Sequence, residues 1–404
     1  MIEKDKEKNS IKNYEEKISP ENLYQLEKNH FSYQKSLKND KNIKGEKLNA
    51  ISDPLKMLTY NLFLRPPLIN NNGNDYKNER TELICKMMEQ YDIICFQELF
   101  PNYNMRRNKI CKKAEELDLI FQARPRNHPL LSAYLVGSGL LTLSKYPIVK
   151  NRFFSFKDGA GIDGISYKGI LYTKIFTGGS KSHSQMNYMH LFNAHLQASY
   201  DTHFDEKYCG HYQARLNQVV QLRDVITQCL KSYSNKKSSK NIKIKEKIMI
   251  VGDFNINSRA PKIPKNLFKF KDERAQDLIE SFRGDTFSEY DFLVGCLSNF
   301  GEDEIIDHLF VNYKNHPVTY AESEIVEGKE IPMETVLTNK NDLCSNQSLD
   351  YMFEIIPQGI SEEDIDSIEV LPASCMVRKF KVDEKYFSQL SDHYGVEITL
   401  INNY

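Results

Sequence analysis

Apolar residues recur along short stretches of the chain, either alternating with polar residues or in continuous runs, and both patterns predict β-strands. The predicted strands are residues 56–64, 92–100, 139–149, 168–176, 187–197, 247–257, 304–311, 348–356 and 390–401. Helical spacing of apolar residues predicts helices over residues 78–91 and 211–230, the second with a broad stripe that would pack on a sheet. Strands dominate, helices intervene, and no break divides the chain after residue 54. We therefore predict one large mixed α/β domain, residues 54–404.

Two segments differ from this pattern. Residues 1–53 are rich in Lys, Glu and Asn with few branched apolar residues, which predicts a flexible polar N-terminal tail. Residues 231–247 are rich in lysine, and we expect a solvated surface loop there.

Composition narrows the classes of partner. The chain has 54 basic and 55 acidic residues, so it lacks the basic surplus of a dedicated nucleic-acid binder. The first residues contain no apolar signal-peptide core, and the longest near-apolar stretch, 130–143, is shorter than the about 20 residues that span a bilayer. Eight cysteines form no CxxC pair, and we expect them to be reduced. We expect a cytoplasmic monomer whose contact with membranes is peripheral.

Polar residues stand at the ends of several predicted strands, where sheet packing alone would not select them. They are Asn61, Gln97 and Glu98, Asn193 and His195, Asp253 and Asn255, Asp350, and Asp392 and His393. Any one of them could be a turn former, a helix N-cap or an interior polar group that is fully hydrogen-bonded. Together they favour a site, because strand ends on one side of a layered α/β domain are common binding positions.

The chemistry of this set is narrow. Carboxylates, amides and imidazoles are present without a thiolate cluster, which favours a hard cation, Mg²⁺ or alternatively Mn²⁺. A hard cation beside amides and imidazoles suits phosphate ester hydrolysis. Asp253 and Asn255 are two residues apart and would face the same side of an extended strand. We expect His393, at a solvent-facing strand end, to need a carboxylate that fixes its tautomer.

The motifs YN, QE, GDFN and SDH, in this order, resemble the endonuclease/exonuclease/phosphatase superfamily over residues 55–401. The resemblance implies the fold of deoxyribonuclease I, a sandwich of two mixed sheets flanked by helices, with the site at one edge. The segments GSGLLTLSKYPI, YKGILYTKI and FNAHLQAS are similar to the neutral sphingomyelinase branch.

The resemblance also implies roles for individual residues. Glu98 and Asp392 would hold the metal; Asn61, Asn255 and Lys168 would bind substrate; and His195, Asp253, Asp350 and His393 would be catalytic. Both Asp307 and Asp350 match the acid that orients the last histidine, and Asp350 is preferred because LDY before a strand is the closer match. The group that activates water is either His393 or Asp253.

The activity implied is Mg²⁺-dependent hydrolysis of sphingomyelin, or of a related phospholipid, at a membrane surface, with release of phosphocholine. One alternative is a nuclease or phosphatase on the same fold, which would show a basic groove beside the site. The other is an inactive binding module, which is disfavoured because no expected acid, amide or imidazole is missing. The exposed aromatic hairpin of secreted bacterial relatives is not evident in the sequence.

Overall fold

The computed structural model describes residues 54–66, 70–100, 105–125, 136–179, 185–199, 204–234, 243–358, 368–383 and 385–402. The chain divides into two units, Met1–Ile51 and Ser52–Tyr404, and the described helices and strands all belong to the second. The predicted flexible tail, residues 1–53, lies outside the described residues, so the tail and its boundary stay predictions.

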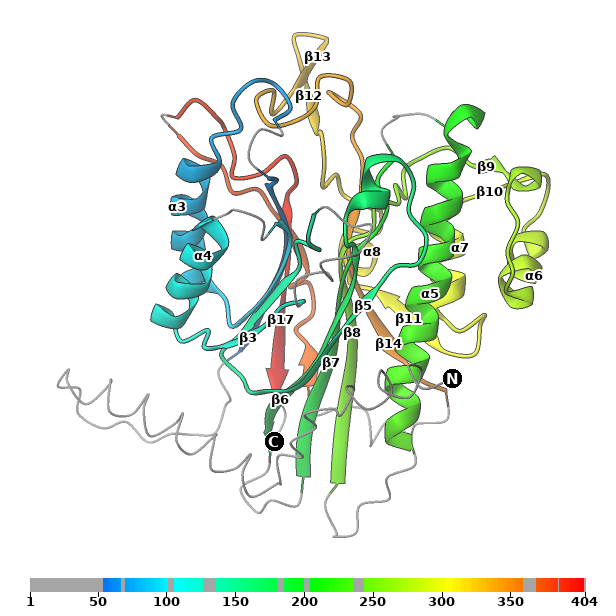
Figure 1. The fold of residues 1–404 in the computed structure, drawn as a ribbon, viewed down its shortest axis with the longest axis horizontal. Helices are drawn as coiled ribbons and strands as arrows, with labels where there is room; N and C mark the ends of the chain where they lie inside the picture. Colours follow the sequence, from blue (N-terminus) through cyan, green and yellow to red (C-terminus); the bar gives the residue numbers. More distant parts are fainter. Residues whose placement is uncertain are drawn as a thin grey trace, which may run out of the picture. The chain divides into compact units, whose positions relative to one another are not determined.

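One sheet has seven strands in the order β15-β17-β1-β2-β4-β3, with β16 also paired to β17. In chain order the strands are β1 (Leu55–Leu64), β2 (Ile93–Leu99), β3 (Phe121–Ala123), β4 (Leu141–Ser144), β15 (Ile368–Val370), β16 (Met376–Arg378) and β17 (Gly395–Asn402). Strand β1 runs parallel to β2 and antiparallel to β17. Helices α3 (Lys77–Met87) and α4 (Met105–Glu116) lie on the outer face of this sheet (Figure 1).

The second sheet has six strands in the order β11-β14-β8-β7-β6-β5. They are β5 (Ile148–Ser155), β6 (Gly169–Gly179), β7 (Gln185–His195), β8 (Lys243–Asp253), β11 (Glu304–Asp307) and β14 (Asp350–Ile356). Strands β7 and β8 are parallel to each other, and the other neighbours in this sheet are antiparallel.

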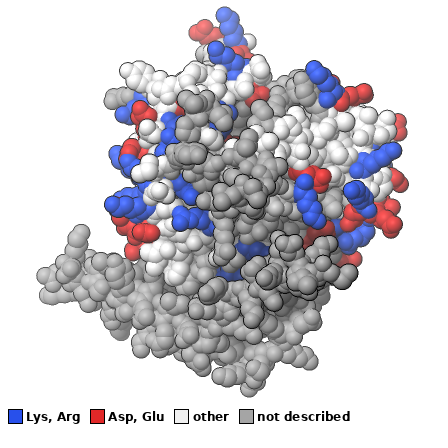
Figure 2. Space-filling model, in the orientation of Figure 1, with Lys and Arg blue, Asp and Glu red and all other residues white. Residues whose placement is uncertain are grey.

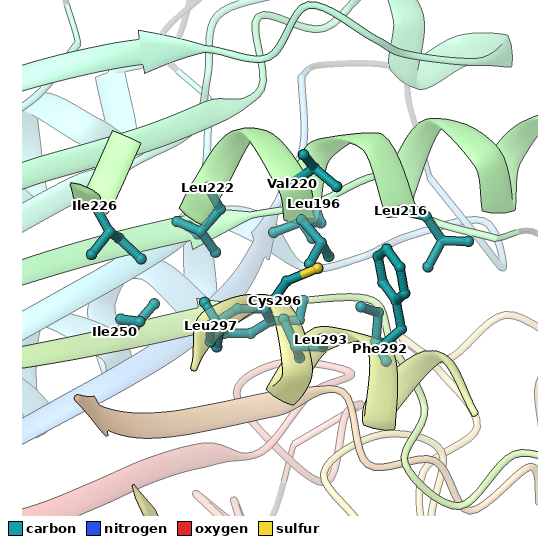
Figure 3. Close-up of a cluster of buried hydrophobic side chains, with 14 of the residues drawn as sticks. Leu196, Leu216, Val220, Leu222, Ile226, Ile250, Phe292, Leu293, Cys296 and Leu297 are labelled. Carbon is teal, nitrogen blue, oxygen red and sulfur yellow. The ribbon is translucent and has the colours of Figure 1, made fainter. Parts of the chain in front are cut away.

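Helices α5 (Cys209–Ser234) and α7 (Glu289–Leu297) cover the outer face of the six-stranded sheet, with α6 (Glu273–Ser281) beside them (Figure 1). Figure 3 shows Leu216 of α5 facing Phe292 of α7, in a cluster that also includes Val220 and Cys296. These side chains are buried, and the apolar stripe predicted for residues 211–230 is the face that makes this contact.

The inner faces of the two sheets pack on each other through buried apolar side chains. This layer includes Met57, Cys95, Leu191, Met249, Val251 and Val396. Two mixed sheets with helices on their outer faces confirm the predicted sandwich.

Several predicted elements differ from the structure. Residues 139–149 contain two strands, β4 and β5, which belong to different sheets. Residues 308–311 begin a short helix, α8 (His308–Tyr313), because the Asp307 carboxylate accepts a bond from Phe310 N and caps the helix. The lysine-rich segment is not a loop throughout, since α5 extends to residue 234 and β8 starts at residue 243.

The last strand begins at Gly395, so Asp392 and His393 precede it rather than open it. A two-stranded hairpin that the sequence did not reveal also projects at the top of Figure 1, formed by β12 (Ser323–Val326) and β13 (Lys329–Pro332). Its turn places Glu327 and Gly328 at positive φ, as a tight two-residue hairpin requires. Two further short strands, β9 (Ile263–Pro264) and β10 (Thr286–Phe287), pair with each other. Among the described residues, no helix is both long and apolar enough to cross a membrane.

Candidate active site

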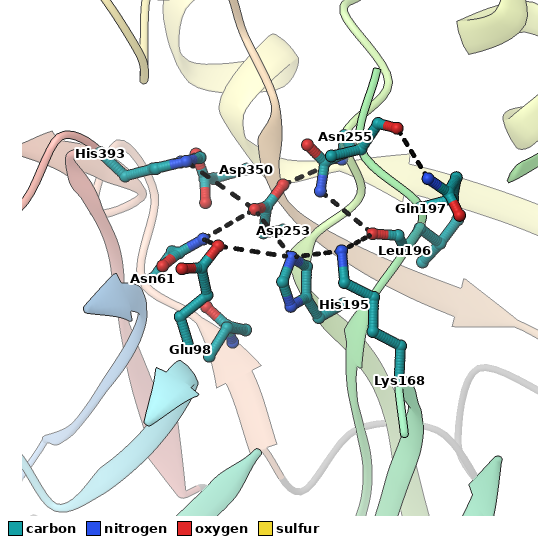
Figure 4. A network of polar contacts seen from close by, with 12 residues as sticks. Asn61, Glu98, Lys168, His195, Leu196, Gln197, Asp253, Asn255, Asp350 and His393 are labelled. Atoms are coloured by element: carbon teal, nitrogen blue, oxygen red, sulfur yellow. Dashed lines mark hydrogen bonds and ion pairs between the residues drawn. The ribbon is translucent and has the colours of Figure 1, made fainter. Parts of the chain in front are cut away.

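The polar strand ends of both sheets meet in one cluster (Figure 4). His195, Asp253 and Asp350 end or begin three adjacent strands of the six-stranded sheet, and Asp253 is the register partner of both others. Asn61 of β1 and Glu98 of β2 come from the seven-stranded sheet. The register of the strands and the Asn61 hydrogen bonds therefore bring these side chains together at one edge of the sandwich.

Asp253 is the central carboxylate of the cluster and is almost fully buried. Its Oδ2 accepts a 2.8 Å hydrogen bond from Asn61 Nδ2, and its Oδ1 accepts a 2.9 Å bond from the backbone N–H of Asn255. The Nε2 atoms of His195 and His393 lie 3.5 and 3.8 Å from Asp253 Oδ2. Burial raises the pKa of Asp253, and His393 opposes that rise.

His393 is buried, not solvent-facing as expected from a strand end. Its Nδ1 lies 2.9 Å from Asp350 Oδ2, and its ring centroid lies 4.8 Å from that of Tyr320. Burial by itself would lower the pKa of His393, but the carboxylates of Asp350 and Asp253 raise it well above the usual value. The two carboxylates therefore favour the charged form of the imidazole.

Asp307, the other candidate partner for His393, lies in different surroundings. Its Oδ2 accepts a 2.7 Å hydrogen bond from the Tyr290 hydroxyl and lies 2.9 Å from His316 Nε2. The carboxylate that contacts His393 is thus that of Asp350, the residue preferred from the sequence.

His195 and Lys168 lie side by side. Lys168 Nζ is 3.2 Å from His195 Nε2, donates a 2.8 Å bond to Leu196 O, and pairs with Asp163 Oδ2 at 2.7 Å. Burial, and after it the positive charges of Lys168 and His393, hold the pKa of His195 well below its usual value.

Asp163 was missed from the sequence. Its Oδ2 also accepts a 2.8 Å bond from Ala198 N, so it joins Lys168 to the segment that follows His195. It lies in a short 3₁₀ helix, Gly161–Ile165, outside any predicted strand, and its only sequence signal is Lys168 five positions later.

Glu98 has the features of a metal ligand. Its Oε1 accepts a 3.2 Å hydrogen bond from Asn61 Nδ2 and lies 3.9 Å from His195 Nε2, while Oε2 is buried without a hydrogen-bond partner among the described residues. Ligand atoms of Glu98, His195 and Asp253 all lie within 4.8 Å of one another. An unpartnered buried carboxylate oxygen in an oxygen-rich cluster fits a hard cation.

Asp392 is placed differently. Among the described residues, the groups that could hold an ion are Glu98–His195–Asp253 and Asp253–Asp350–His393, and neither includes Asp392. Its Oδ1 accepts a 3.2 Å bond from Ser391 Oγ. Burial raises the pKa of Asp392 to about 7. The positive charge of His393 opposes this rise, and the negative charge of Glu98 adds to it. Its predicted metal role stays a prediction.

Asn61 and Asn255 are held firmly. The Asn61 amide donates to both Glu98 and Asp253, and its Oδ1 accepts a bond from Phe63 N. Asn255 Nδ2 donates a 3.1 Å bond to Leu196 O. Both residues belong to the cluster, and their predicted contact with substrate stays a prediction.

Three non-glycine residues at this edge have left-handed backbone conformations, namely Phe63, Glu98 and Asn255, with φ of 49°, 53° and 51°. Such conformations cost free energy and persist where the surrounding structure enforces them, often at functional sites. Opposite Glu98, a Cβ on Gly139 would come within 3.1 Å of the Glu98 Cα, so this close approach requires glycine.

Comparisons with known proteins relate this chain to one family and one fold. The sequence profile of the endonuclease/exonuclease/phosphatase family matches residues 58–329. A sphingomyelinase of Dictyostelium discoideum is 31% identical over 385 residues, covering 83% of this chain and 77% of that protein.

Solved structures share the fold. Beta toxin from Staphylococcus aureus superposes with a TM-score of 0.52 at 18% identity, covering 85% of this chain and 99% of that one. A variant of the same toxin with bound magnesium ions gives a TM-score of 0.50 at 18% identity, over 87% of this chain and 100% of the toxin.

Proposed function

The chain belongs to the endonuclease/exonuclease/phosphatase family and is a phosphodiesterase-type hydrolase, and on that basis we propose that it hydrolyses sphingomyelin or a closely related phospholipid. The products would be a ceramide-type lipid and phosphocholine. The observation that carries the choice of substrate is the likeness to the Dictyostelium sphingomyelinase across 83% of the chain.

We assign Mg²⁺ to the carboxylate of Glu98. A hard cation held there would neutralise charge on the phosphate oxygens. The unpartnered Glu98 Oε2 and the magnesium-containing relative of the same fold support this assignment. Asn61, which donates to both Glu98 and Asp253, holds the two carboxylates at fixed separation.

In the proposed reaction Asp253 acts on the attacking water and His393 acts on a phosphate oxygen. His393 Nε2 and Asp253 Oδ2 are 3.8 Å apart, and we place both beside the attacking water, with the leaving oxygen in line on the opposite side of the phosphorus. His393 carries its proton between two carboxylates and is suited to neutralise a phosphate oxygen. Asp253 accepts the proton of the water, the water oxygen bonds to phosphorus, and the bond from phosphorus to the lipid oxygen breaks. The departing lipid oxygen takes up a proton from solvent and becomes the hydroxyl of the lipid product.

Contact with the membrane surface would be made by the β12–β13 hairpin. Ile325, Val326 and Ile331 are exposed there, Ile325 by 70%. The hairpin starts three residues after Tyr320, which packs on the His393 ring, so its base adjoins the site. Exposed aliphatic groups next to a lipid-hydrolysing site would enter the bilayer interface.

The charges on the described surface do not favour a nucleic-acid substrate. On the face shown in Figure 2, the described Lys and Arg side chains are interspersed with Asp and Glu rather than gathered in a basic groove. A nuclease would gather positive charge along the phosphate backbone.

A headgroup-release assay tests the proposal. The purified full chain is incubated with vesicles of sphingomyelin, phosphatidylcholine or lysophosphatidylcholine, and separately with duplex DNA, each with Mg²⁺ or with EDTA. We expect phosphocholine release from sphingomyelin that EDTA abolishes. Cleavage of DNA without release of phosphocholine from any lipid would refute the proposal.

A further inference from the structure

Gln97 and Asn193 stand next to the site in sequence but have no role in the chemistry above. Gln97 precedes Glu98 on β2, and Asn193 lies two residues before His195 on β7. Both side chains are fully buried.

The two amides bond to each other across the interface between the sheets. Gln97 Nε2 donates a 2.8 Å bond to Asn193 Oδ1 and a 3.0 Å bond to Thr59 Oγ1. Asn193 Nδ2 in turn donates to the carbonyls of Phe96 and Leu141, at 3.2 and 3.3 Å. One side chain of the six-stranded sheet thus binds two strands of the seven-stranded sheet.

This polar pair departs from its surroundings. The same inter-sheet layer is otherwise built largely from apolar side chains, such as Met57, Cys95, Leu191 and Val251. Gln97 Oε1 is buried without a hydrogen-bond partner among the described residues. An apolar pair of similar size would avoid that cost, so stability alone does not account for the amides. Unlike apolar contacts, hydrogen bonds are directional, so this pair fixes the position of β2 relative to β7.

The register matters because Glu98 comes directly after Gln97 on β2. Glu98 has a left-handed backbone with φ of 53°, which its neighbours must hold in place. On its far side, Leu99 N donates a 2.9 Å bond to Gly139 O. On its near side, the Gln97 side chain is anchored to β7 by Asn193. Phe96 and Leu141, whose carbonyls Asn193 binds, form the last pair of the β2–β4 ladder before the strained residue.

We propose that Gln97 and Asn193 are positioning residues, an inter-sheet hydrogen-bond pair that sets the Glu98 carboxylate opposite His195 and so determines the affinity of the site for its divalent cation. The inference rests on the assignment of Glu98 as a metal ligand in the proposed function, and it does not depend on which lipid is the substrate.

The test measures metal binding without substrate. Calorimetric titration with Mg²⁺ and with Mn²⁺ is run on the full chain and on Gln97→Leu, Asn193→Leu and the double variant, each with its thermal midpoint. We expect about a 10-fold loss of metal affinity in each single variant and no greater loss in the double variant, because the two residues act as one unit. The double variant should keep the wild-type thermal midpoint or exceed it.

Asn312→Leu is the matched control, since Asn312 Nδ2 also bonds a backbone carbonyl of another segment, that of Cys375, away from the cluster. It should leave metal affinity unchanged. If the double variant does not fold, Gln97→Asn, which keeps the amide but shortens its reach, should still weaken binding.

Wild-type metal affinity in the double variant, or in Gln97→Asn, would overturn the proposal. A lowered thermal midpoint with unchanged affinity would also overturn it, because that is a purely structural role. A wild-type chain that binds no divalent ion would overturn this proposal together with the metal assignment. A chain that binds Mg²⁺ but releases no phosphocholine would refute only the proposed substrate.

Discussion

The Nδ1 atom of His393 lies 2.9 Å from Asp350 Oδ2, and this bond joins the segment before β17 to the first residue of β14 in the other sheet. We expect His393→Ala to lower kcat by about 10²-fold or more, the range of groups that take part in proton transfer. Asp350→Asn should give a similar loss by releasing the orientation of the ring. The double variant should be little worse than either single variant. The measurement is kcat on headgroup-labelled sphingomyelin at saturating Mg²⁺.

Asp307→Asn is the internal control for this pair, because Asp307 contacts Tyr290 and His316 rather than His393. Its effect on kcat should be mild. Additive losses at His393 and Asp350, or a larger loss at Asp307 than at Asp350, would show that the pair does not act as one unit. Since His393 is buried, the thermal midpoint of its variant must be measured beside kcat to separate misfolding from lost chemistry.

Glu98→Gln should weaken metal binding while the fold survives. The substitution keeps the shape of the side chain and removes its charge, and the wild-type Oε2 has no hydrogen-bond partner among the described residues that the change would break. We expect the Mg²⁺ concentration for half-maximal activity to rise at least about 10-fold, as expected for loss of a charged oxygen ligand. Unchanged Mg²⁺ dependence at wild-type kcat would remove Glu98 from the metal site.

The sequence sufficed for those parts of the site that a strand pattern determines. Glu98, His195, Asp253 and Asp350 lie at or next to strand ends, and strand pairing brings these ends to one edge. Asn61 lies three residues before the end of β1, which continues to Leu64. The strand and helix pattern predicted one mixed α/β domain, and the sandwich of two sheets followed from the family resemblance.

Other features depend on tertiary context, which local pattern does not contain. Asp163 reaches Lys168 and Ala198 from a short 3₁₀ helix that no strand pattern predicts. The hydrogen bond between Gln97 and Asn193 forms only because the two sheets face each other. The change from strand to helix after Asp307 depends on a capping carboxylate, whereas the apolar run alone favours a longer strand. The burial of His393 likewise depends on Tyr320, 73 positions earlier in the chain.

A second charged cluster, at the opposite half of the six-stranded sheet, makes stability depend on pH. Glu246 pairs with Lys174 and lies 3.3 Å from His190 Nε2. Burial alone would raise the pKa of Glu246, but His190 and Lys174 lower it to about 2. A carboxyl with a depressed pKa stabilises the fold above its unfolded value near 4.5, and that stability is lost as the pH falls toward about 2.

We therefore expect Glu246→Gln to have an unfolding free energy on the order of 2 kcal/mol below that of the wild type at pH 6. This difference should shrink as the pH falls below about 4.5, because the wild-type carboxylate then becomes protonated. Urea unfolding at a series of pH values measures this. If the difference in unfolding free energy between variant and wild type is the same at pH 6 and pH 3, the charge of Glu246 does not stabilise the fold.

The β12–β13 hairpin gives a test of membrane contact that is independent of catalysis. Ile325 and Ile331 are on opposite faces of the hairpin, because Ile325 pairs with Glu330 and Glu324 with Ile331. Both faces therefore present an exposed isoleucine. Replacing both by serine should weaken binding to sphingomyelin vesicles by about 10-fold or more, given about 0.8 kcal/mol for each buried methylene group.

The same change should leave hydrolysis of detergent-dispersed sphingomyelin near the wild-type rate, since neither residue touches the cluster around Asp253. Val311→Ser is the matched control, because Val311 is an aliphatic residue of α8 that is 51% exposed, and it should bind vesicles as wild type does. Acidic residues outnumber basic ones on the hairpin, with Glu324, Glu327 and Glu330 against Lys329, so adding anionic lipid should not strengthen binding. Sedimentation with vesicles of defined composition measures the wild type and both variants. If Val311→Ser loses as much vesicle binding as the double variant, or if the double variant binds vesicles fully, the membrane contact lies elsewhere on the protein.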